Sequence, residues 1–419
     1  MKRIIKRHPH VLLFGILQIF FSAPGQTFFI SLFVTTIFDD LGLSRSLFAG
    51  IYSAATLSAA LLLNPAGRLI DKISVNKVLV LNSLLMATGC CLIASAKTAG
   101  TLFVGFFLVR LIGQGVFGLT ASTLLSKSFV KNRGKALGIM TLGFPLSEIV
   151  YPTLGIAMLA IFGWRISYLI FAATFIVLML PLQWFLLSKS KFKLGHFFPD
   201  EMSVQPQHLA DMTEHKERIM KPNMTLSTVL KDPVFFIIIS ASCIPPLLMT
   251  GLLFHQDTLF ASHEWPIFLA ASGLAVYAIL KALTSVLTGP LVDNHGPTAP
   301  FSALIAMLGL GTLLAGIGGP TWIIFVYFGL MGAALGMSSP VMSVIWPNLY
   351  GTVHLGSIKG VVSTFRNGLT AFGPLPIALA LDMNISIDAL LISTACVVFA
   401  LALVPFGVYL LRPAINRTY

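Results

Sequence analysis

The sequence is poor in charged residues. Asp, Glu, Lys and Arg together make up 10% of its 419 residues, whereas about a quarter of a typical soluble domain is charged. Hydrophobic residues make up 56%, and the mean hydropathy is +0.89. This composition excludes a water-soluble globular domain.

The sequence also lacks the alternating segments of about ten residues that are typical of membrane β-strands. Its apolar runs are instead about twenty residues long, which is the length that crosses a bilayer as a helix. We therefore predict an all-α, multi-pass integral membrane protein.

The sequence also lacks any recognisable catalytic or metal-binding motif. No nucleophile–base pair and no metal-ligand set is recognisable. The four cysteines lie inside apolar runs, and we interpret them as small packing residues. The net charge of +12 does not indicate a nucleic-acid partner, because the basic residues lie at the ends of apolar runs. We expect no enzyme activity, no metal and no cofactor.

Twelve apolar segments predict twelve transmembrane helices. They cover residues 11–37, 46–66, 77–96, 100–126, 136–160, 164–187, 233–256, 266–289, 299–318, 321–347, 360–381 and 388–411. The long polar stretch 188–232 separates the sixth segment from the seventh. We therefore expect an N-terminal six-helix bundle (1–187), a cytoplasmic linker (188–232) and a C-terminal six-helix bundle (233–419).

The distribution of Lys and Arg predicts the orientation. With the N-terminus inside, only Arg45, Lys97 and Arg165 fall in outer loops, while the inner loops, the linker and both termini are rich in basic residues. Positive loops stay on the cytoplasmic side. Both termini are thus expected in the cytoplasm, and the short outer loops favour a bacterial inner membrane.

The two halves repeat a pattern after their second spans. The first copy reads GRLIDKIS (67–74) and the second reads GPLVDNHG (289–296), so that Gly, Leu and Asp recur at the same spacing. Internal repeats of this kind build secondary transporters, whose halves rock about a site near the middle of the bilayer.

Together these motifs resemble the major facilitator superfamily. Gly67, Leu69, Asp71 and Lys72 match the loop signature of the family, although Ser74 replaces its second Gly. The fourth span reads RLIGQGVFG (110–118), similar to the Arg-x-x-x-Gln-Gly pattern of the family. The resemblance implies two pseudo-symmetric six-helix bundles and transport by alternating access.

Charges inside the spans are the candidates for function, because each is costly in a bilayer and usually faces a cavity or a partner. Four lie deep, namely Arg110, Glu148, Lys281 and Arg366, whereas Asp257 and Asp382 lie near the outer ends of their spans. Helical rise places Arg110 and Glu148 at nearly the same level. We therefore expect an Arg110–Glu148 pair, which either couples a proton to transport through Glu148 or only fixes helix packing.

The other two deep charges, Lys281 and Arg366, are positive and lie at similar depths in the C-terminal half, where no deep acid answers them. Polar residues accompany the deep charges at helical spacing. The stripes are Gln18, Ser22 and Gln26 in span one, Arg110, Gln114 and Ser122 in span four, Tyr277, Lys281, Thr284, Ser285 and Thr288 in span eight, and Ser363, Arg366, Asn367 and Thr370 in span eleven. We expect these faces to line one polar cavity.

A cavity with three cations and one acid would attract an anion. The stretches RGKALGIMTLG (133–143) and HLGSIKG (354–360) resemble the monocarboxylate porter and oxalate–formate exchanger branch of the superfamily. This resemblance implies that cations on spans eight and eleven hold a carboxylate. The expected binding residues are Lys281, Arg366, Tyr277, Asn367, Arg110, Gln114 and Gln26. The alternative is that Lys281 only snorkels or meets a carbonyl.

The repeated loops predict a gate. The resemblance places Asp71 against the N-terminal end of span eleven, where the helix dipole favours an acid. Gly67, Lys72, Gly289 and Asp293 complete the predicted gate. The same residues would also serve as tight turns with topology-setting charges.

The predicted function is a monomeric secondary transporter of a small mono- or dicarboxylate, by proton symport or anion exchange. The alternative is a proton-driven exporter of amphiphilic compounds. Against it, GIMTLGFPLSE (138–148) lacks the adjacent Gly-Pro and the Gly pair of the exporters' span-five motif. A non-transporting sensor with a transporter fold is a third possibility, for which the linker offers no recognisable domain.

Overall fold

The computed structural model describes residues 8–129, 133–189, 224–351, 354–412 and 415. Within the helices, the side chains of residues 64, 67–72, 126–127, 133–135, 293, 355–357, 363 and 367 lie outside the description. Every regular element in the described ranges is a helix, which agrees with the predicted all-α class.

The first half of the chain begins with a broken helix and ends with a long bent one. Its helices are α2 (Pro9–Phe20), η1 (Ala23–Gly25), α3 (Thr27–Ile30), η2 (Ser31–Phe33), α4 (Val34–Asp40), α5 (Arg45–Lys72), α6 (Val75–Ala94), α7 (Ala99–Val109), η3 (Arg110–Val116), α8 (Phe117–Ser128), α9 (Arg133–Met140), α10 (Gly143–Thr174), η4 (Phe175–Met179) and α11 (Leu180–Ser188). The segments η3 and η4 are π-helical.

The second half contains fewer breaks. Its helices are α13 (Leu226–Val229), α14 (Pro233–Phe254), α15 (Gln256–Ser262), α16 (Leu269–His295), α17 (Thr298–Ile317), α18 (Trp322–Tyr350), α19 (Leu355–Thr370), α20 (Pro374–Asp382), α21 (Ile387–Leu401) and α22 (Val404–Leu411).

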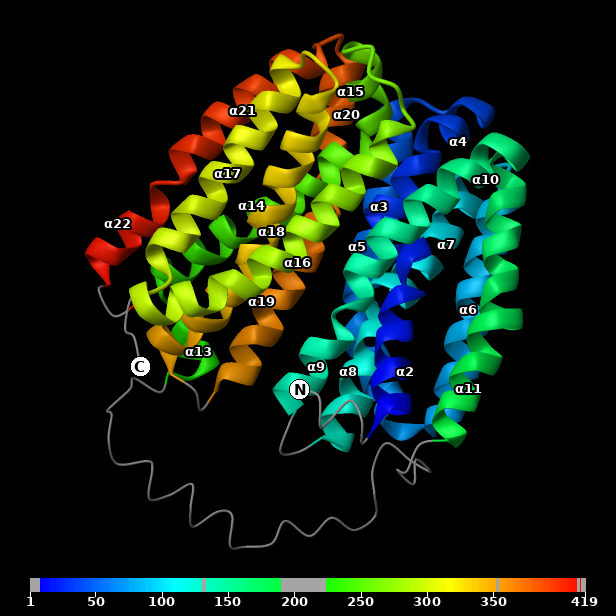
Figure 1. Ribbon diagram of the computed structural model, residues 1–419, viewed down its shortest axis with the longest axis horizontal. Helices are drawn as coiled ribbons and strands as arrows, with labels where there is room; N and C mark the ends of the chain where they lie inside the picture. Colours follow the sequence, from blue (N-terminus) through cyan, green and yellow to red (C-terminus); the bar gives the residue numbers. More distant parts are fainter. Residues whose placement is uncertain (1–7, 130–132, 190–223, 352–353, 413–414, 416–419) are drawn as a thin grey trace, which may run out of the picture.

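The two halves lie side by side as two groups of helices, α2–α11 and α13–α22 (Figure 1). The helices α4, α15 and α20 lie at one end of the molecule, which we call the α15 end, and α13 lies at the opposite end. The predicted orientation makes the α15 end the outer one. The exact domain boundaries stay a prediction, because residues 190–223 of the expected linker lie outside the described ranges.

Fewer spans than twelve are recognised by length and composition alone. In the described residues nine helices are long and apolar enough to cross a membrane, or ten if the pair Pro9–Gly25 and Thr27–Asp40, bent by 46°, is one span. One recognised stretch, Ala136–Ser188, contains Gly163 with φ 71°, which interrupts α10 between the predicted spans five and six. Twelve spans therefore remain a prediction.

The first span breaks at η1, where Pro24 lacks an N–H group to continue the helix. This break lies directly against η3, since an added Cβ on Gly25 would lie 2.7 Å from the Cα of Gly113 and 2.1 Å from the carbonyl oxygen of Val109. Two glycines thus allow backbone-to-backbone packing of span one on span four. The contact places the break beside Arg110, the first residue of η3.

Hydrogen bonds join the two halves at the α15 end. Thr35 Oγ1 donates to Asp257 Oδ2 at 2.5 Å, and the Ser46 backbone N–H donates to Asp382 Oδ2 at 3.1 Å. The ring of Phe254 also packs against Tyr52, with 4.8 Å between centroids. The two acids that the sequence places near span ends therefore connect one half to the other.

The repeated segments after the second and eighth spans were expected to be loops, and this expectation is wrong for most of their length. Helix α5 continues to Lys72, and α16 continues to His295 with Pro290 inside it. Each span extends by about one or two helical turns beyond its apolar stretch, so the polar residues of the motif lie on helix ends.

Candidate substrate-binding site

Glu148 of α10 and Lys281 of α16 form an ion pair between the two halves. Lys281 Nζ lies 2.5 Å from Glu148 Oε1. The Glu148 side chain is only 5% exposed and that of Lys281 is 25% exposed, so water reaches the pair mainly from the lysine side. The acid that pairs with Lys281 thus comes from the other half of the chain, a pairing that the sequence analysis did not predict.

Two aromatic rings also surround the lysine. The ammonium lies 5.2 Å from the ring centroid of Tyr277 and 5.7 Å from that of Phe144, within the range of cation–π attraction. Tyr277 is buried, and Glu148, Lys281 and Arg366 all lie within electrostatic range of its hydroxyl. Tyr277 therefore links the ion pair to the second cation of the C-terminal half.

Arg366 of α19 is half-buried and has no hydrogen bond or ion pair to any described residue. Cys243 of α14 and Tyr277 of α16 lie within electrostatic range of its guanidinium. A guanidinium offers five N–H donors in a planar fork that matches a carboxylate. The side chain of its predicted partner Asn367 lies outside the described residues.

Arg110 binds neutral oxygens of its own half. Its Nε donates to Thr56 Oγ1 at 3.0 Å, and its Nη1 donates to the carbonyl oxygen of Gly25 at 2.9 Å and to Thr27 Oγ1 at 3.4 Å. The guanidinium carbon lies 5.0 Å from the centroid of the Tyr52 ring. Arg110 is 1% exposed, and its Nη2 has no partner among the described residues.

The predicted Arg110–Glu148 pair is therefore wrong. The physical reason is the break in span one, which leaves the carbonyl of Gly25 free to accept from Arg110. Side chains of neighbouring helices commonly satisfy backbone groups that a break inside the membrane frees.

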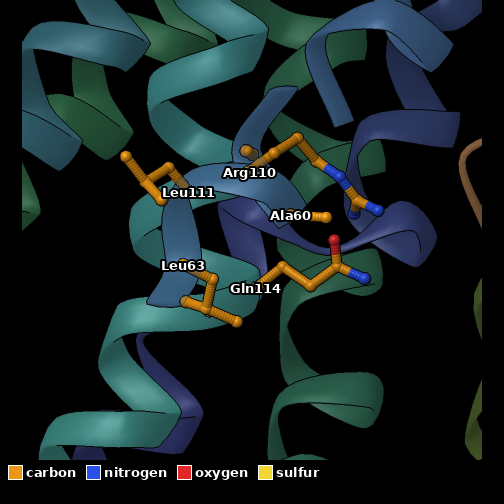
Figure 2. A pocket seen from close by; sticks show the side chains of 7 residues that line it. Ala60, Leu63, Arg110, Leu111 and Gln114 are labelled. Atoms are coloured by element: carbon orange, nitrogen blue, oxygen red, sulfur yellow. The ribbon is translucent and has the colours of Figure 1, made fainter. Parts of the chain in front are cut away.

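Two predicted ligand-binding glutamines lie near Arg110. Gln26 Nε2 donates to the Gly113 carbonyl at 3.4 Å and to Ser22 Oγ at 3.3 Å. Gln114 lines a small pocket with Arg110, and Figure 2 shows both side chains extending to the same side of the helix. The pocket has a volume of about 10 Å³, which is near the lower limit for one water. It is too small for a carboxylic acid.

Some members of the predicted polar stripes form hydrogen bonds to neighbouring helices. The Gln18 amide is buried and donates to Gln183 Oε1 at 3.0 Å, in α11. The hydroxyl of Thr284 donates to the carbonyl oxygens of Leu280 and Ala333, at 2.8 and 3.0 Å. These two side chains therefore connect neighbouring helices, and their place in one common polar face stays a prediction.

The predicted gate is outside what the structure describes, except for one residue. Gly67, Asp71 and Lys72 belong to α5 and Asp293 to α16, but their side chains lie outside the described residues. Gly289 is described, and a Cβ added there would meet open space. The gating roles stay predictions.

A two-halved helical bundle with buried charges between and within its halves is the architecture of a multi-pass membrane transporter. The family model of the Major Facilitator Superfamily matches residues 15–275, more than half of the chain. The chain therefore belongs to the Major Facilitator Superfamily, as its loop and span-four motifs indicate.

Solved transporter structures share this fold. The nucleoside transporter NupG superposes with a TM-score of 0.66 at 16% identity, covering 96% of this chain and 98% of NupG. A mutant of the peptide transporter POT superposes with a TM-score of 0.74 at 13% identity, covering 97% of this chain and 95% of the transporter. A POT family transporter in complex with 5-aminolevulinic acid superposes with a TM-score of 0.74 at 13% identity, covering 97% of this chain and 96% of the transporter. Identities this low support the fold alone. A search of curated protein sequences finds no match.

The sequence did not predict several residues that contact the deep cations. Phe144, Tyr52, Thr27 and Thr56 contact the deep cations but are ordinary residues of apolar helices. One available signal was the Pro24–Gly25 pair, because a break inside a span frees a carbonyl that a deep arginine can bind. The pairing of α10 with α16 had no comparable signal.

Proposed function

We propose that this protein is a secondary active transporter of a small organic anion, a mono- or dicarboxylate, that works by alternating access. The observation that carries the proposal is the unpaired guanidinium of Arg366. It lies within electrostatic range of Tyr277 and has no counter-ion among the described residues. A carboxylate bound bidentately would provide one.

The charge balance of the interior also favours an anion. Of the four deep charges, Arg110, Lys281 and Arg366 are cations and Glu148 is the one acid. The pairing of Lys281 with Glu148 leaves two cations without an acid. Arg110 is 1% exposed and donates through Nε and Nη1 to neutral oxygens of its own half. The half-buried Arg366 is therefore the cation that we assign to the substrate.

The Lys281–Glu148 pair supplies a coupling step. When Glu148 takes up a proton its charge is lost, and Lys281 is free to turn towards a carboxylate held by Arg366. Because Glu148 and Lys281 belong to different halves, making and breaking this pair changes how strongly the halves are held together. Proton symport follows if Glu148 is loaded together with the substrate, and anion exchange follows if it stays ionised.

The remaining roles complete the proposal. Tyr277 and Asn367 orient the carboxylate, while Gln26, Gln114 and Arg110 shape the wall of the opposite half. Asp71 with Gly67 and Lys72, and Asp293 with Gly289, form gates at the cytoplasmic ends of α5 and α16. The protein acts as a monomer in a bacterial inner membrane, with both termini in the cytoplasm. The carboxylate specificity follows the resemblance to monocarboxylate porters and oxalate–formate exchangers.

Uptake of labelled mono- and dicarboxylates into proteoliposomes, at two pH values and with or without internal anion, tests this function. We expect one or more acids to accumulate, and Lys281→Gln and Arg366→Gln to abolish uptake while both variants still insert. Normal uptake by both variants would remove the anion site. The alternative, a proton-driven exporter of amphiphilic compounds, predicts instead efflux of lipophilic cations with no carboxylate uptake.

A further inference from the structure

A second cavity, separate from the ion pair, lies between the two halves at the α15 end. Its volume is about 650 Å³, which is within the range of small-molecule binding sites. One wall comes from η2, α4 and α10 of the first half. The other comes from α15, the segment that leads into α16 and the first turn of α16. The lining residues are Ser31, Leu32, Thr35, Thr36, Ile156, Leu159, Ala160, Gln256, Asp257, Phe260, Ala261, Trp265, Ile267 and Ala270.

The polar side chains of this cavity offer mainly acceptors. The three hydroxyl groups in the wall already donate their hydrogens: Ser31 to the Phe28 carbonyl at 3.2 Å, Thr36 to the Phe33 carbonyl at 2.9 Å, and Thr35 to Asp257. The indole N–H of Trp265 donates to the Gly319 carbonyl at 2.7 Å. Apart from the amide N–H groups of Gln256, no side-chain donor in the wall is left for a ligand.

Two acceptors remain. Gln256 is 2% exposed and its Oε1 is buried without a hydrogen-bond partner among the described residues. A buried acceptor left unpaired costs free energy that a donor would recover. The neighbouring Asp257 carboxylate accepts from Thr35 and can accept further bonds through its remaining lone pairs. It is the one charged residue in the cavity wall.

The rest of the wall is apolar and includes two fixed rings. Phe260 and Trp265 pack edge to face at 5.5 Å between centroids, and the hydrogen bond to Gly319 holds the indole in place. Aromatic faces attract cations as well as apolar groups. The wall therefore suits a ligand with an apolar body and a positively charged donor head.

We propose that this cavity binds an amphiphilic primary ammonium, with its head on Asp257 and Gln256 and its apolar tail against Phe260, Trp265 and the aliphatic residues of α10. The preferred charge is opposite to that of the anion site, so the cavity is not an extension of that site. Because the ligand contacts both halves, it stabilises the conformation in which the two halves are in contact at the α15 end.

Decylamine, decanol and decanoate form a set of probes with one tail and three heads. Binding of radiolabelled decylamine is measured on the full chain in nanodiscs of uncharged lipid, with empty nanodiscs subtracted. We expect saturable binding that decanol displaces about tenfold less well and decanoate does not displace, because the ammonium alone pairs with a carboxylate.

Variants of the cavity locate the binding. Asp257→Asn keeps an acceptor for Thr35 and is expected to weaken decylamine binding by about tenfold or more. Ala261→Trp fills the cavity and is expected to abolish binding. Asp388→Asn is the matched control, since Asp388 accepts from Ser262, the last residue of α15, but does not line the cavity. Its binding should equal that of the parent.

Three results overturn the proposal. The first is that decylamine binding, after subtraction of the empty nanodiscs, does not saturate. The second is that Asp257→Asn binds decylamine as tightly as the parent. The third is that decanoate displaces labelled decylamine as well as unlabelled decylamine does. None of these results bears on carboxylate transport, which is measured with different ligands and different variants.

Discussion

Lys281 and Glu148, on helices from different halves of the chain, form one ion pair with 2.5 Å between Nζ and Oε1. The pair determines which partners remain for the other two deep charges, Arg110 and Arg366. It removes Glu148 as a partner for Arg110, and it leaves Arg366 as the half-buried cation without a partner among the described residues.

Breaking the pair from either side should destabilise the protein, and removing both charges should not. Glu148→Gln leaves Lys281 without its counter-ion, and Lys281→Met leaves Glu148 buried and charged. Removal of one partner of a buried pair typically costs about 3–5 kcal/mol, and we expect the lower end because Lys281 is 25% exposed.

A double-mutant cycle on the purified protein checks this expectation through the thermal midpoint. Glu148→Gln combined with Lys281→Met should recover most of the stability lost in either single variant, because no uncompensated charge remains. If the double variant instead loses the sum of the stabilities lost in the two single variants, the two side chains do not interact.

Arg110 is expected to contribute mainly to stability. Arg110→Gln removes charge-assisted bonds to the Gly25 carbonyl and to Thr56, each worth about 1.5–3 kcal/mol. The thermal midpoint should therefore fall clearly, whereas Lys97→Gln on the exposed surface should change the free energy of unfolding by less than about 0.5 kcal/mol. An unchanged midpoint in Arg110→Gln would show that its hydrogen bonds do not support the fold.

The close approach of spans one and four predicts a difference between glycines. A Cβ on Gly25 would lie 2.1 Å from the Val109 carbonyl oxygen, while the nearest neighbour of a Cβ on Gly118 would be Ile19 Cδ1 at 3.9 Å. Gly25→Ala should thus destabilise by more than the usual 1–3 kcal/mol or so of overpacking. Gly118→Ala, whose Cβ would meet only the end of the Ile19 side chain, should be neutral or stabilising by up to about 1 kcal/mol. Similar midpoints for both variants would rule out the backbone contact.

The sequence was sufficient for the membrane class, the family and the list of deep charges. Hydropathy and the cost of charge in a bilayer act on every residue locally, so a single sequence reveals them. The Pro24–Gly25 pair is also a local signal of a helix break, but the sequence does not show which side chain meets the carbonyl that the break frees.

The pairing of the charges could not be predicted in the same way. Helical rise gives the depth of a residue in a straight helix, and the similar depths it gave for Arg110 and Glu148 suggested a pair. Which helices face each other is a lateral property of the packed bundle. The contact of α10 with α16, and not depth, pairs Glu148 with Lys281.

The central claim is that Arg366 holds the carboxylate of the substrate. Its most direct test is equilibrium binding of the carboxylate identified by uptake, measured by calorimetry on the parent, Arg366→Lys and Arg366→Gln. The account predicts that Arg366→Lys, which keeps the charge but loses the bidentate fork, binds about tenfold more weakly. It also predicts that Arg366→Gln shows no measurable binding while its thermal midpoint stays near that of the parent. Carboxylate binding by Arg366→Gln with the affinity of the parent would contradict it.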